Sequence, residues 1–255
     1  MTDIVFVHGM FQNPVSWEKW AGVFSAAGYR CHVPAWPLHE GEPAVLRESP
    51  PAGLGELTLD EVVARIEAAM AGLERPVMIG HSVGGLVTQI MLARGTIAAG
   101  VAVCPVAPNR MVDLDWGFIK NSVTIANPLM GDAPVLMDVA TFHGAFANTL
   151  DATTAAREFE ATATHDSRKV FRGCMGPLGT IDTDQAHAPL LLIAGAEDQI
   201  IPAHLVEKVR DAWGDEGSVV EYAGYAGRSH YICNEPGWEE VAERALGFVR
   251  MACPS

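Results

Sequence analysis

The sequence has few basic residues and no long apolar run. It contains 17 Lys and Arg against 31 Asp and Glu, which gives a net charge of −14 with neutral histidines. A chain this acidic is repelled by phosphate backbones and anionic lipid, so neither a nucleic acid nor a membrane surface is expected as its partner. No uncharged apolar stretch approaches the roughly 18 residues that span a bilayer. The expected partners are small molecules, and homo-oligomer formation is left open.

The cysteines are few and scattered. There are five, an odd number without a CxxC pair, which argues against a disulfide framework and against a zinc site. The first ten residues lack a basic segment followed by a long apolar run, so no secretory signal is recognised. These absences predict a cytoplasmic protein with reduced thiols.

What is present predicts an α/β fold. Hydrophobic residues make up 49% of 255 positions, enough for a sizeable core and too many for a disordered chain. Short runs rich in Val and Ile alternate with helical patterns, which is typical of βαβ units around a parallel sheet. The expected strands are Ile4–Val7, Arg30–Val33, Val77–Gly80, Val101–Cys104, Leu190–Ala194 and Val219–Tyr222.

Proline, glycine and a capping box mark the expected helices. Helices are predicted from Pro14 to Gly28, after Thr58 with Glu61 as a capping box, from Pro202, and from Pro236. Residues 109–186 contain no convincing strand. We expect them to form a helical cap, or lid, inserted into a core made of residues 1–108 and 187–255. An irregular part of the same core is the alternative.

The strongest local motif is Gly80-His81-Ser82-Val83-Gly84-Gly85. It follows an apolar strand and precedes a helical pattern, which is the context of a nucleophile elbow. The glycines leave room for a strained serine backbone, and the following helix N-terminus favours developing negative charge. Ser82 is therefore the candidate nucleophile.

Two further residues complete a candidate triad. Asp198 follows the strand Leu190–Ala194, and His230 lies on a loop before the last helix. The chain order serine, acid, histidine is the order of α/β hydrolases. His230 would take the serine proton, and Asp198 would orient the imidazole. Glu197 is the competing acid.

The loop His8-Gly9-Met10-Phe11 follows the first strand and is the candidate oxyanion loop. The backbone N–H groups of Met10 and Val83 are the expected donors. His8 is expected to brace this loop, and His81 to pack away from the site. The histidines taken as surface or loop residues are His39, His143, His165, His187 and His204. Because no metal-ligand spacing and no Walker or GxGxxG motif occurs, no metal or cofactor is expected.

With these motifs in their order, the chain resembles the α/β-hydrolase superfamily. The resemblance implies a mostly parallel sheet, a cap inserted after Val101–Cys104, and an acyl-enzyme mechanism that uses water. It also supports Asp198 over Glu197 as the acid. The superfamily usually begins with two extra strands, whereas the first expected strand here starts at residue 4. A sheet of about six strands is therefore expected, similar to the compact plant methylesterase and hydroxynitrile-lyase branch. Haloalkane dehalogenases and epoxide hydrolases resemble this chain but need an aspartate at the elbow. Ser82 at that position therefore argues against both.

Apolar side chains around the elbow suggest an apolar acyl or aryl group in the substrate. The candidate lining residues are Met10, Phe11, Trp36, Trp116, Phe118, Phe142 and Phe146, and any of them could instead join cap to core. The expected function is a serine esterase acting on small to medium apolar carboxylic esters. A lactonase with the same triad, a hydroxynitrile-lyase-like or cofactor-free haloperoxidase-like enzyme, and a non-catalytic ligand receptor remain alternatives.

Overall fold

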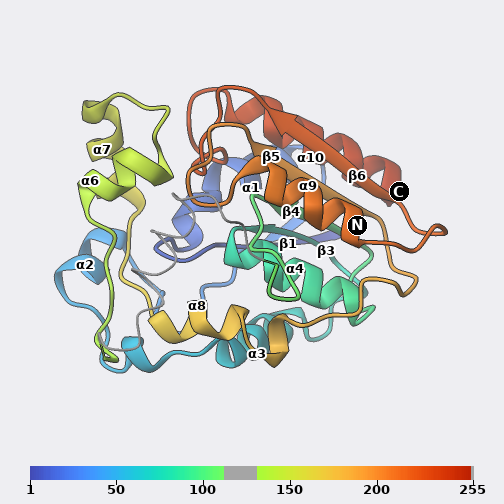
Figure 1. Cartoon of the computed structure of the whole chain (residues 1–255), viewed down its shortest axis with the longest axis horizontal. Helices are drawn as coiled ribbons and strands as arrows, with labels where there is room; N and C mark the ends of the chain where they lie inside the picture. Colours follow the sequence, from blue (N-terminus) through green and yellow to red (C-terminus); the bar gives the residue numbers. More distant parts are fainter. Residues whose placement is uncertain (112–130, 254–255) are drawn as a thin grey trace.

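The fold is built on one parallel sheet. The computed structural model describes residues 1–111 and 131–253. Six parallel strands lie in the order β2-β1-β3-β4-β5-β6 (Figure 1). The strands are β1 (Asp3–Val7), β2 (Arg30–His32), β3 (Val77–His81), β4 (Ala99–Val103), β5 (Leu190–Gly195) and β6 (Val220–Tyr225). The expected six-stranded sheet is confirmed.

The four central strands are buried on both faces, as their apolar sequences require. Their register places Phe6 beside Ile79 and Ile79 beside Val101. Side chains alternate between the two faces of a strand, so Phe6 and Val7 belong to different hydrophobic clusters. The outer strands β2 and β6 are only partly buried.

Helices cover both faces of the sheet. The α-helices are α1 (Glu18–Ala26), α2 (Pro43–Glu48), α3 (Leu59–Met70), α4 (Val83–Ala93), α6 (Val139–Thr141), α7 (Ala152–Thr162), α8 (Arg168–Cys174), α9 (Ala203–Ala212) and α10 (Trp238–Ala252). Helices α1 and α10 pack on one face, where Trp20 and Phe248 are fully buried. Helices α3, α4 and α9 contribute to the cluster on the other face (Figure 1). No helix within residues 1–111 and 131–253 is long and apolar enough to cross a bilayer.

The helix boundaries follow the sequence signals closely. Thr58 and Glu61 form the expected capping box of α3, with both reciprocal bonds present. The helix expected from Pro14 starts as a 3₁₀ turn, Pro14–Trp17, and continues as α1. The last helix begins at Trp238, two residues after the expected start, because Gly237 takes a left-handed conformation that precedes the first helical turn.

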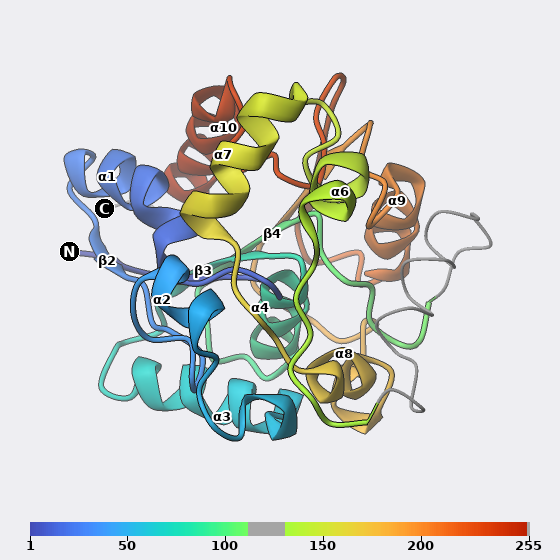
Figure 2. The ribbon, with the colours of Figure 1, turned by 90° about the vertical axis from the view of Figure 1, so that its left-hand side faces the viewer.

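The segment between β4 and β5 consists of short helices joined by irregular stretches where it is described. It contains α6, a single π-helical turn (Phe142–Phe146), α7, α8 and a 3₁₀ turn (Pro177–Gly179), with one isolated antiparallel bridge between Val135 and Asp166. Helix α7 packs against α2, and α8 against α3 (Figure 2). Apolar side chains of α8 belong to the same cluster as those of α3 and α4. The division into core and cap stays a prediction, because the two parts share one hydrophobic cluster.

Candidate active site

Ser82 occupies the sharp turn between β3 and α4. Its backbone has φ 55° and ψ −118°, a region that non-glycine residues seldom adopt. The surrounding backbone holds this conformation, since the Ser82 N–H donates to the Val103 carbonyl at 2.9 Å. A side chain at Gly84 would meet the carbonyl of His8 at 2.6 Å, and one at Gly80 would meet the Gly84 carbonyl. The elbow therefore depends on glycine at both positions.

Asp198 and His230 come together at the end of the sheet where Ser82 lies. Nδ1 of His230 is 2.7 Å from Oδ2 of Asp198, and both side chains are buried. Oδ1 of Asp198 accepts the N–H groups of Ile200 and Ile201 at 2.7 and 2.8 Å. These bonds fix the carboxylate, which in turn sets the orientation of the imidazole. Glu197, the competing acid, is exposed.

The other ring nitrogen of His230 is available for chemistry. Nε2 is buried and has no hydrogen-bond partner among the residues that the structure describes. In the tautomer whose Nδ1 donates to Asp198, Nε2 carries the free lone pair. A buried, unpaired acceptor of this kind is suited to remove a proton from a nucleophile.

Residues of the π-helical turn and the loop after it connect the acid loop to the histidine loop. The Phe146 carbonyl accepts the N–H of Tyr231, and the Asn148 amide donates to the Glu197 carbonyl at 2.8 Å. The ring of Phe146 packs edge-on against His230, with ring centroids 4.9 Å apart. This segment therefore fixes both loops from outside the sheet.

Glu235 anchors the histidine loop from within. It is 2% exposed, and its carboxylate accepts the N–H and the hydroxyl of Ser229 at 3.0 and 2.8 Å. It also accepts the hydroxyl of Thr149. The residue before His230 is thus fixed by a buried carboxylate that the sequence analysis did not single out.

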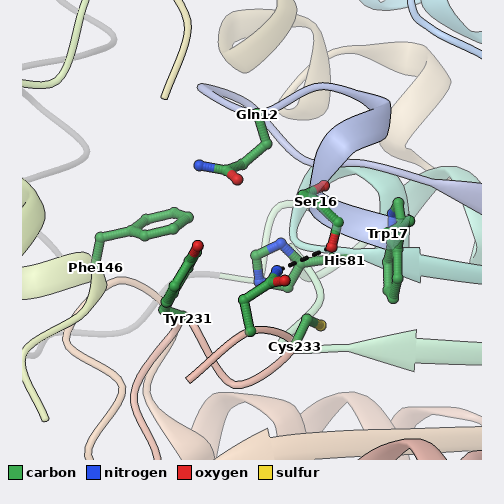
Figure 3. A pocket seen from close by; sticks show the side chains of 8 residues that line it. Gln12, Ser16, Trp17, His81, Phe146, Tyr231 and Cys233 are labelled. Atoms are coloured by element: carbon green, nitrogen blue, oxygen red, sulfur yellow. Dashed lines mark hydrogen bonds between the residues drawn. The ribbon is translucent and has the colours of Figure 1, made fainter. Parts of the chain in front are cut away.

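His81 supports His230 from the opposite side. Its Nε2 lies 2.9 Å from the His230 carbonyl, and burial, followed by the nearby His230 ring, holds its pKa well below the usual value. His81 was expected to pack away from the site, but its ring lies beside that of His230, with ring centroids 4.6 Å apart. The side chain also lines a small cavity of about 10 Å³, shown in Figure 3 with Gln12 and Phe146. Such a cavity has room for about one water molecule.

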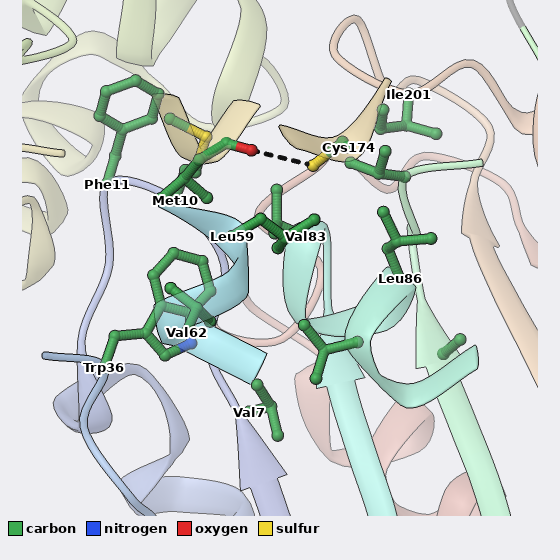
Figure 4. Close-up of a cluster of buried hydrophobic side chains, with 14 of the residues drawn as sticks. Val7, Met10, Phe11, Trp36, Leu59, Val62, Val83, Leu86, Cys174 and Ile201 are labelled. Carbon is green, nitrogen blue, oxygen red and sulfur yellow. Dashed lines mark hydrogen bonds between the residues drawn. The ribbon is translucent and has the colours of Figure 1, made fainter. Parts of the chain in front are cut away.

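The candidate oxyanion loop approaches the elbow closely. A Cβ atom built on Gly9 would lie 2.8 Å from the Ser82 Cβ, so Gly9 allows the loop to pass next to the serine. The side chains of Met10 and Val83 are buried in the cluster drawn in Figure 4. Their N–H groups as oxyanion donors stay a prediction.

His8 braces this loop, as expected. Its Nδ1 lies 2.9 Å from the Gly9 carbonyl, and its Nε2 accepts the N–H of Trp36 at 3.2 Å. Burial, followed by the nearby His39, holds the pKa of His8 well below its usual value. A neutral imidazole with one donating and one accepting nitrogen fits both contacts.

Some candidate lining residues pack helices and loops together, and others lie beside His230 or on the candidate oxyanion loop. Trp36 is fully buried against the ring of His8, with centroids 4.5 Å apart, and Phe142 is 1% exposed among other aromatic rings. In this structure both pack elements together, which was the stated alternative. Phe146 contacts His230, and Phe11 is buried on the oxyanion loop. Trp116 and Phe118 lie outside the described residues.

Cys104 is a third side chain beside the acid and the histidine. Ligand atoms of Cys104, Asp198 and His230 all lie within 4.8 Å of one another, a set that could in principle hold a metal ion. Burial, and then the Asp198 charge, raises the pKa of the Cys104 thiol well above its usual value. A metal would require the thiolate and would compete with the Asp198–His230 bond. The set therefore fits a hydrogen-bonded cluster better than a metal site.

His39 and Asp166 were missed by the sequence analysis. His39 was expected to be a surface or loop residue; it lies on a loop but is 1% exposed, with Nε2 3.5 Å from Oδ2 of Asp166. The expected surface position was wrong because the side chain packs between His8, Trp36 and the distant Asp166. Asp166 is fully buried and accepts the N–H of Phe11 at 3.0 Å. No motif or spacing in the sequence marks this pair.

Many solved structures resemble this fold. A monoacylglycerol lipase from Paleococcus ferrophilus is 19% identical with a TM-score of 0.71, over 98% of this chain and 94% of that one. An extracellular α/β-hydrolase from a Paenibacillus species, described as sharing homology with tobacco salicylic acid binding protein 2, is 16% identical with a TM-score of 0.71 over 100% of both chains. Polyneuridine aldehyde esterase is 16% identical with a TM-score of 0.69, over 97% of this chain and 98% of that one. At these identities the likeness shows the fold alone.

Sequence comparison gives the family. No curated protein matches the sequence. A family model described as the alpha/beta hydrolase family matches residues 4–244, most of the chain. The chain therefore belongs to the α/β hydrolase family.

Proposed function

We propose that this protein is a serine hydrolase that cleaves small to medium apolar carboxylic esters through an acyl-enzyme intermediate. The proposal rests on the buried Asp198–His230 pair, in which Nε2 of His230 has no partner among the described residues. The same chain holds Ser82 in a strained elbow. Membership of a family of hydrolases supports this reaction class.

In the first half-reaction, Nε2 of His230 takes the proton from Oγ of Ser82 as the oxygen attacks the ester carbonyl. The carbonyl electron pair moves to oxygen, and the N–H groups of Met10 and Val83 stabilise the resulting oxyanion. When the intermediate collapses, the C–O bond to the alcohol breaks and the imidazolium returns the proton to the alcohol oxygen. Asp198 stabilises the imidazolium throughout.

In the second half-reaction, water replaces the alcohol. His230 takes a proton from water, and the resulting hydroxide attacks the acyl carbonyl. Collapse of this second intermediate releases the carboxylic acid and returns the proton to Ser82. The step consumes one water molecule for each ester bond.

The surroundings favour an apolar substrate. Met10 and Phe11 are apolar side chains on the loop that carries the proposed oxyanion donor Met10. Phe146 is an apolar side chain whose ring contacts His230. We further propose that residues 109–186 act as the cap that limits substrate size, because Phe146 and Asn148 contact the loops of both His230 and Asp198.

The test is covalent labelling with a fluorophosphonate, followed by intact-protein mass. Wild type and Cys104→Ala should each gain one adduct, and Ser82→Ala should gain none. Cys104→Ala is the matched control, since Cys104 is the other nucleophilic side chain beside Asp198 and His230. An adduct that persists in Ser82→Ala would exclude Ser82 as the nucleophile. No adduct on folded wild type would favour a ligand receptor.

A further inference from the structure

Asp166 lies at the centre of a buried set of hydrogen-bond donors. Its side chain is fully buried, and Oδ2 accepts the N–H of Phe11 at 3.0 Å while Oδ1 accepts the N–H of Ser167 at 2.6 Å. Nε2 of His39 lies 3.5 Å from Oδ2. Its backbone is held by the two-way bridge to Val135, at 2.8 Å for each bond. Hydrogen bonds to the backbone and to the side chain of Asp166 therefore both hold the carboxylate in place.

The oxyanion loop needs an external support at this point. Phe11 has φ 63°, a left-handed conformation that is unfavourable for a residue with a side chain. Both of its backbone polar groups bond to the same distant segment: its N–H donates to Asp166, and its carbonyl accepts the N–H of Thr164 at 3.0 Å. The turn that follows Met10 is therefore imposed by residues 164–166.

We propose that Asp166 is a positioning residue for the oxyanion hole. Asp166 acts through Phe11. By holding the Phe11 N–H, Asp166 fixes the peptide between Met10 and Phe11, and this peptide in turn restricts the direction of the Met10 N–H. Asp166 contacts no reacting atom itself. The inference rests on the proposed esterase function, and it makes the segment between β4 and β5 part of the machinery that stabilises the transition state.

A carboxylate is required at this position, and an amide does not suffice. Phe11 and Ser167 present N–H donors to the two oxygens, and Nε2 of His39 lies 3.5 Å from one of them without a hydrogen bond. An ionised carboxylate has only acceptors, so it can face donors on every side. Asparagine has nearly the same shape, but its NH₂ group would face a donor wherever it is placed. Asp166→Asn therefore removes an acceptor without opening a cavity.

Ser167→Ala is the matched control for a purely structural role. Ser167 is also fully buried, and its hydroxyl donates to the Gly55 carbonyl at 2.9 Å. This bond ties the same segment to the 3₁₀ turn Leu54–Glu56 without contacting Phe11. If Asp166 only holds the segment in place, both variants should lose activity to a similar degree.

The experiment compares binding of a transition-state analogue with binding of a ground-state analogue. A trifluoromethyl ketone forms a tetrahedral adduct with serine and needs the oxyanion hole, whereas the corresponding secondary alcohol cannot form one. For Asp166→Asn we expect kcat for a p-nitrophenyl ester to fall about 10- to 100-fold with little change in KM, below the roughly 10²- to 10³-fold cost of losing one whole oxyanion donor. Affinity for the trifluoromethyl ketone should fall by a similar factor, and affinity for the alcohol should stay within about threefold of wild type.

The outcomes separate the two proposals. If wild type hydrolyses esters and Asp166→Asn keeps kcat within threefold, the inference about Asp166 is overturned and the esterase function stands. An equal loss of affinity for ketone and alcohol, or an equal loss of activity in Ser167→Ala, also overturns it. A folded wild type with neither ester hydrolysis nor fluorophosphonate labelling overturns both. Should Asp166→Asn fail to fold, Asp166→Glu is the second variant: its extra methylene moves the carboxylate away from its place 3.0 Å from the Phe11 N–H, so a loss in kcat is again expected.

Discussion

Asp198 and His230 form a hydrogen-bonded pair that solvent scarcely reaches, with 2.7 Å between Oδ2 and Nδ1 and exposures of 4% and 0%. Two backbone N–H groups hold the other carboxylate oxygen, so the acid cannot rotate without losing three bonds. The imidazole therefore keeps one tautomer and one orientation. Such preorganisation lowers the cost of forming the imidazolium during a reaction.

The first prediction concerns this pair. His230→Ala should lower kcat on the order of 10⁶-fold, as should Ser82→Ala, because the two act as a unit. Asp198→Asn should cost less, on the order of 10⁴-fold, since Ser82 and His230 remain. Steady-state kinetics with a p-nitrophenyl ester measures all three. Near-normal activity of His230→Ala beside an inactive Ser82→Ala would show that another group is the base.

The five cysteines should differ in reactivity. Cys104, Cys174 and Cys233 are buried, and burial raises the pKa of each thiol, that of Cys174 to about 12. Cys31 and Cys253 are partly exposed. We expect iodoacetamide to modify at most these two in native protein and all five in urea, as read by intact mass. Rapid modification of Cys104 in native protein would contradict its burial.

His39 should make stability depend on pH. Burial alone lowers the pKa of His39, but the nearby Asp166 carboxylate, with smaller effects from Pro37 and Glu40, raises it above its usual value. A raised folded pKa means that the bound proton stabilises the native state. This contribution is complete below the unfolded value of about 6.5 and is lost as pH rises through the folded value.

We therefore expect the difference in unfolding free energy between wild type and His39→Gln to be largest near about pH 6 and to shrink as pH rises. Urea denaturation at several pH values measures this difference. Comparing the two proteins at each pH cancels most other titrating groups. A difference that grows with pH would mean that His39 is neutral beside Asp166.

Glu235 should matter for both stability and activity. Glu235→Gln replaces an acceptor by a donor facing Ser229 and Thr149, which should cost about 1–3 kcal/mol in unfolding free energy. Because Ser229 precedes His230, kcat should fall as well. Urea denaturation and kinetics test both effects. Glu239→Gln, an exposed residue of α10, is the control and should change neither. A stable Glu235→Gln with full activity would show that the loop is held by other contacts.

Local patterns in the sequence determined the sheet and the elbow. The central strands are buried on both faces, so their apolar runs mark them directly. The elbow glycines, the capping box of α3 and the proline before α9 act within a few residues, and each lies where the sequence placed it. The bond between Asp198 and His230 was also anticipated, because chain order and strand ends locate both residues.

Only the tertiary structure decided what supports these residues. Phe11 and Asp166 are 155 positions apart, and Tyr231 bonds to a carbonyl 85 positions earlier, at Phe146 (231 − 146 = 85). A lone buried carboxylate or histidine has no periodicity and no motif, since its role comes from donors supplied by other segments. The burial of His39 could not be read from the sequence for that reason. The sequence by itself defines which reactive side chains follow the strand ends. The packing of residues 131–186 onto these loops determines how the side chains are held in place.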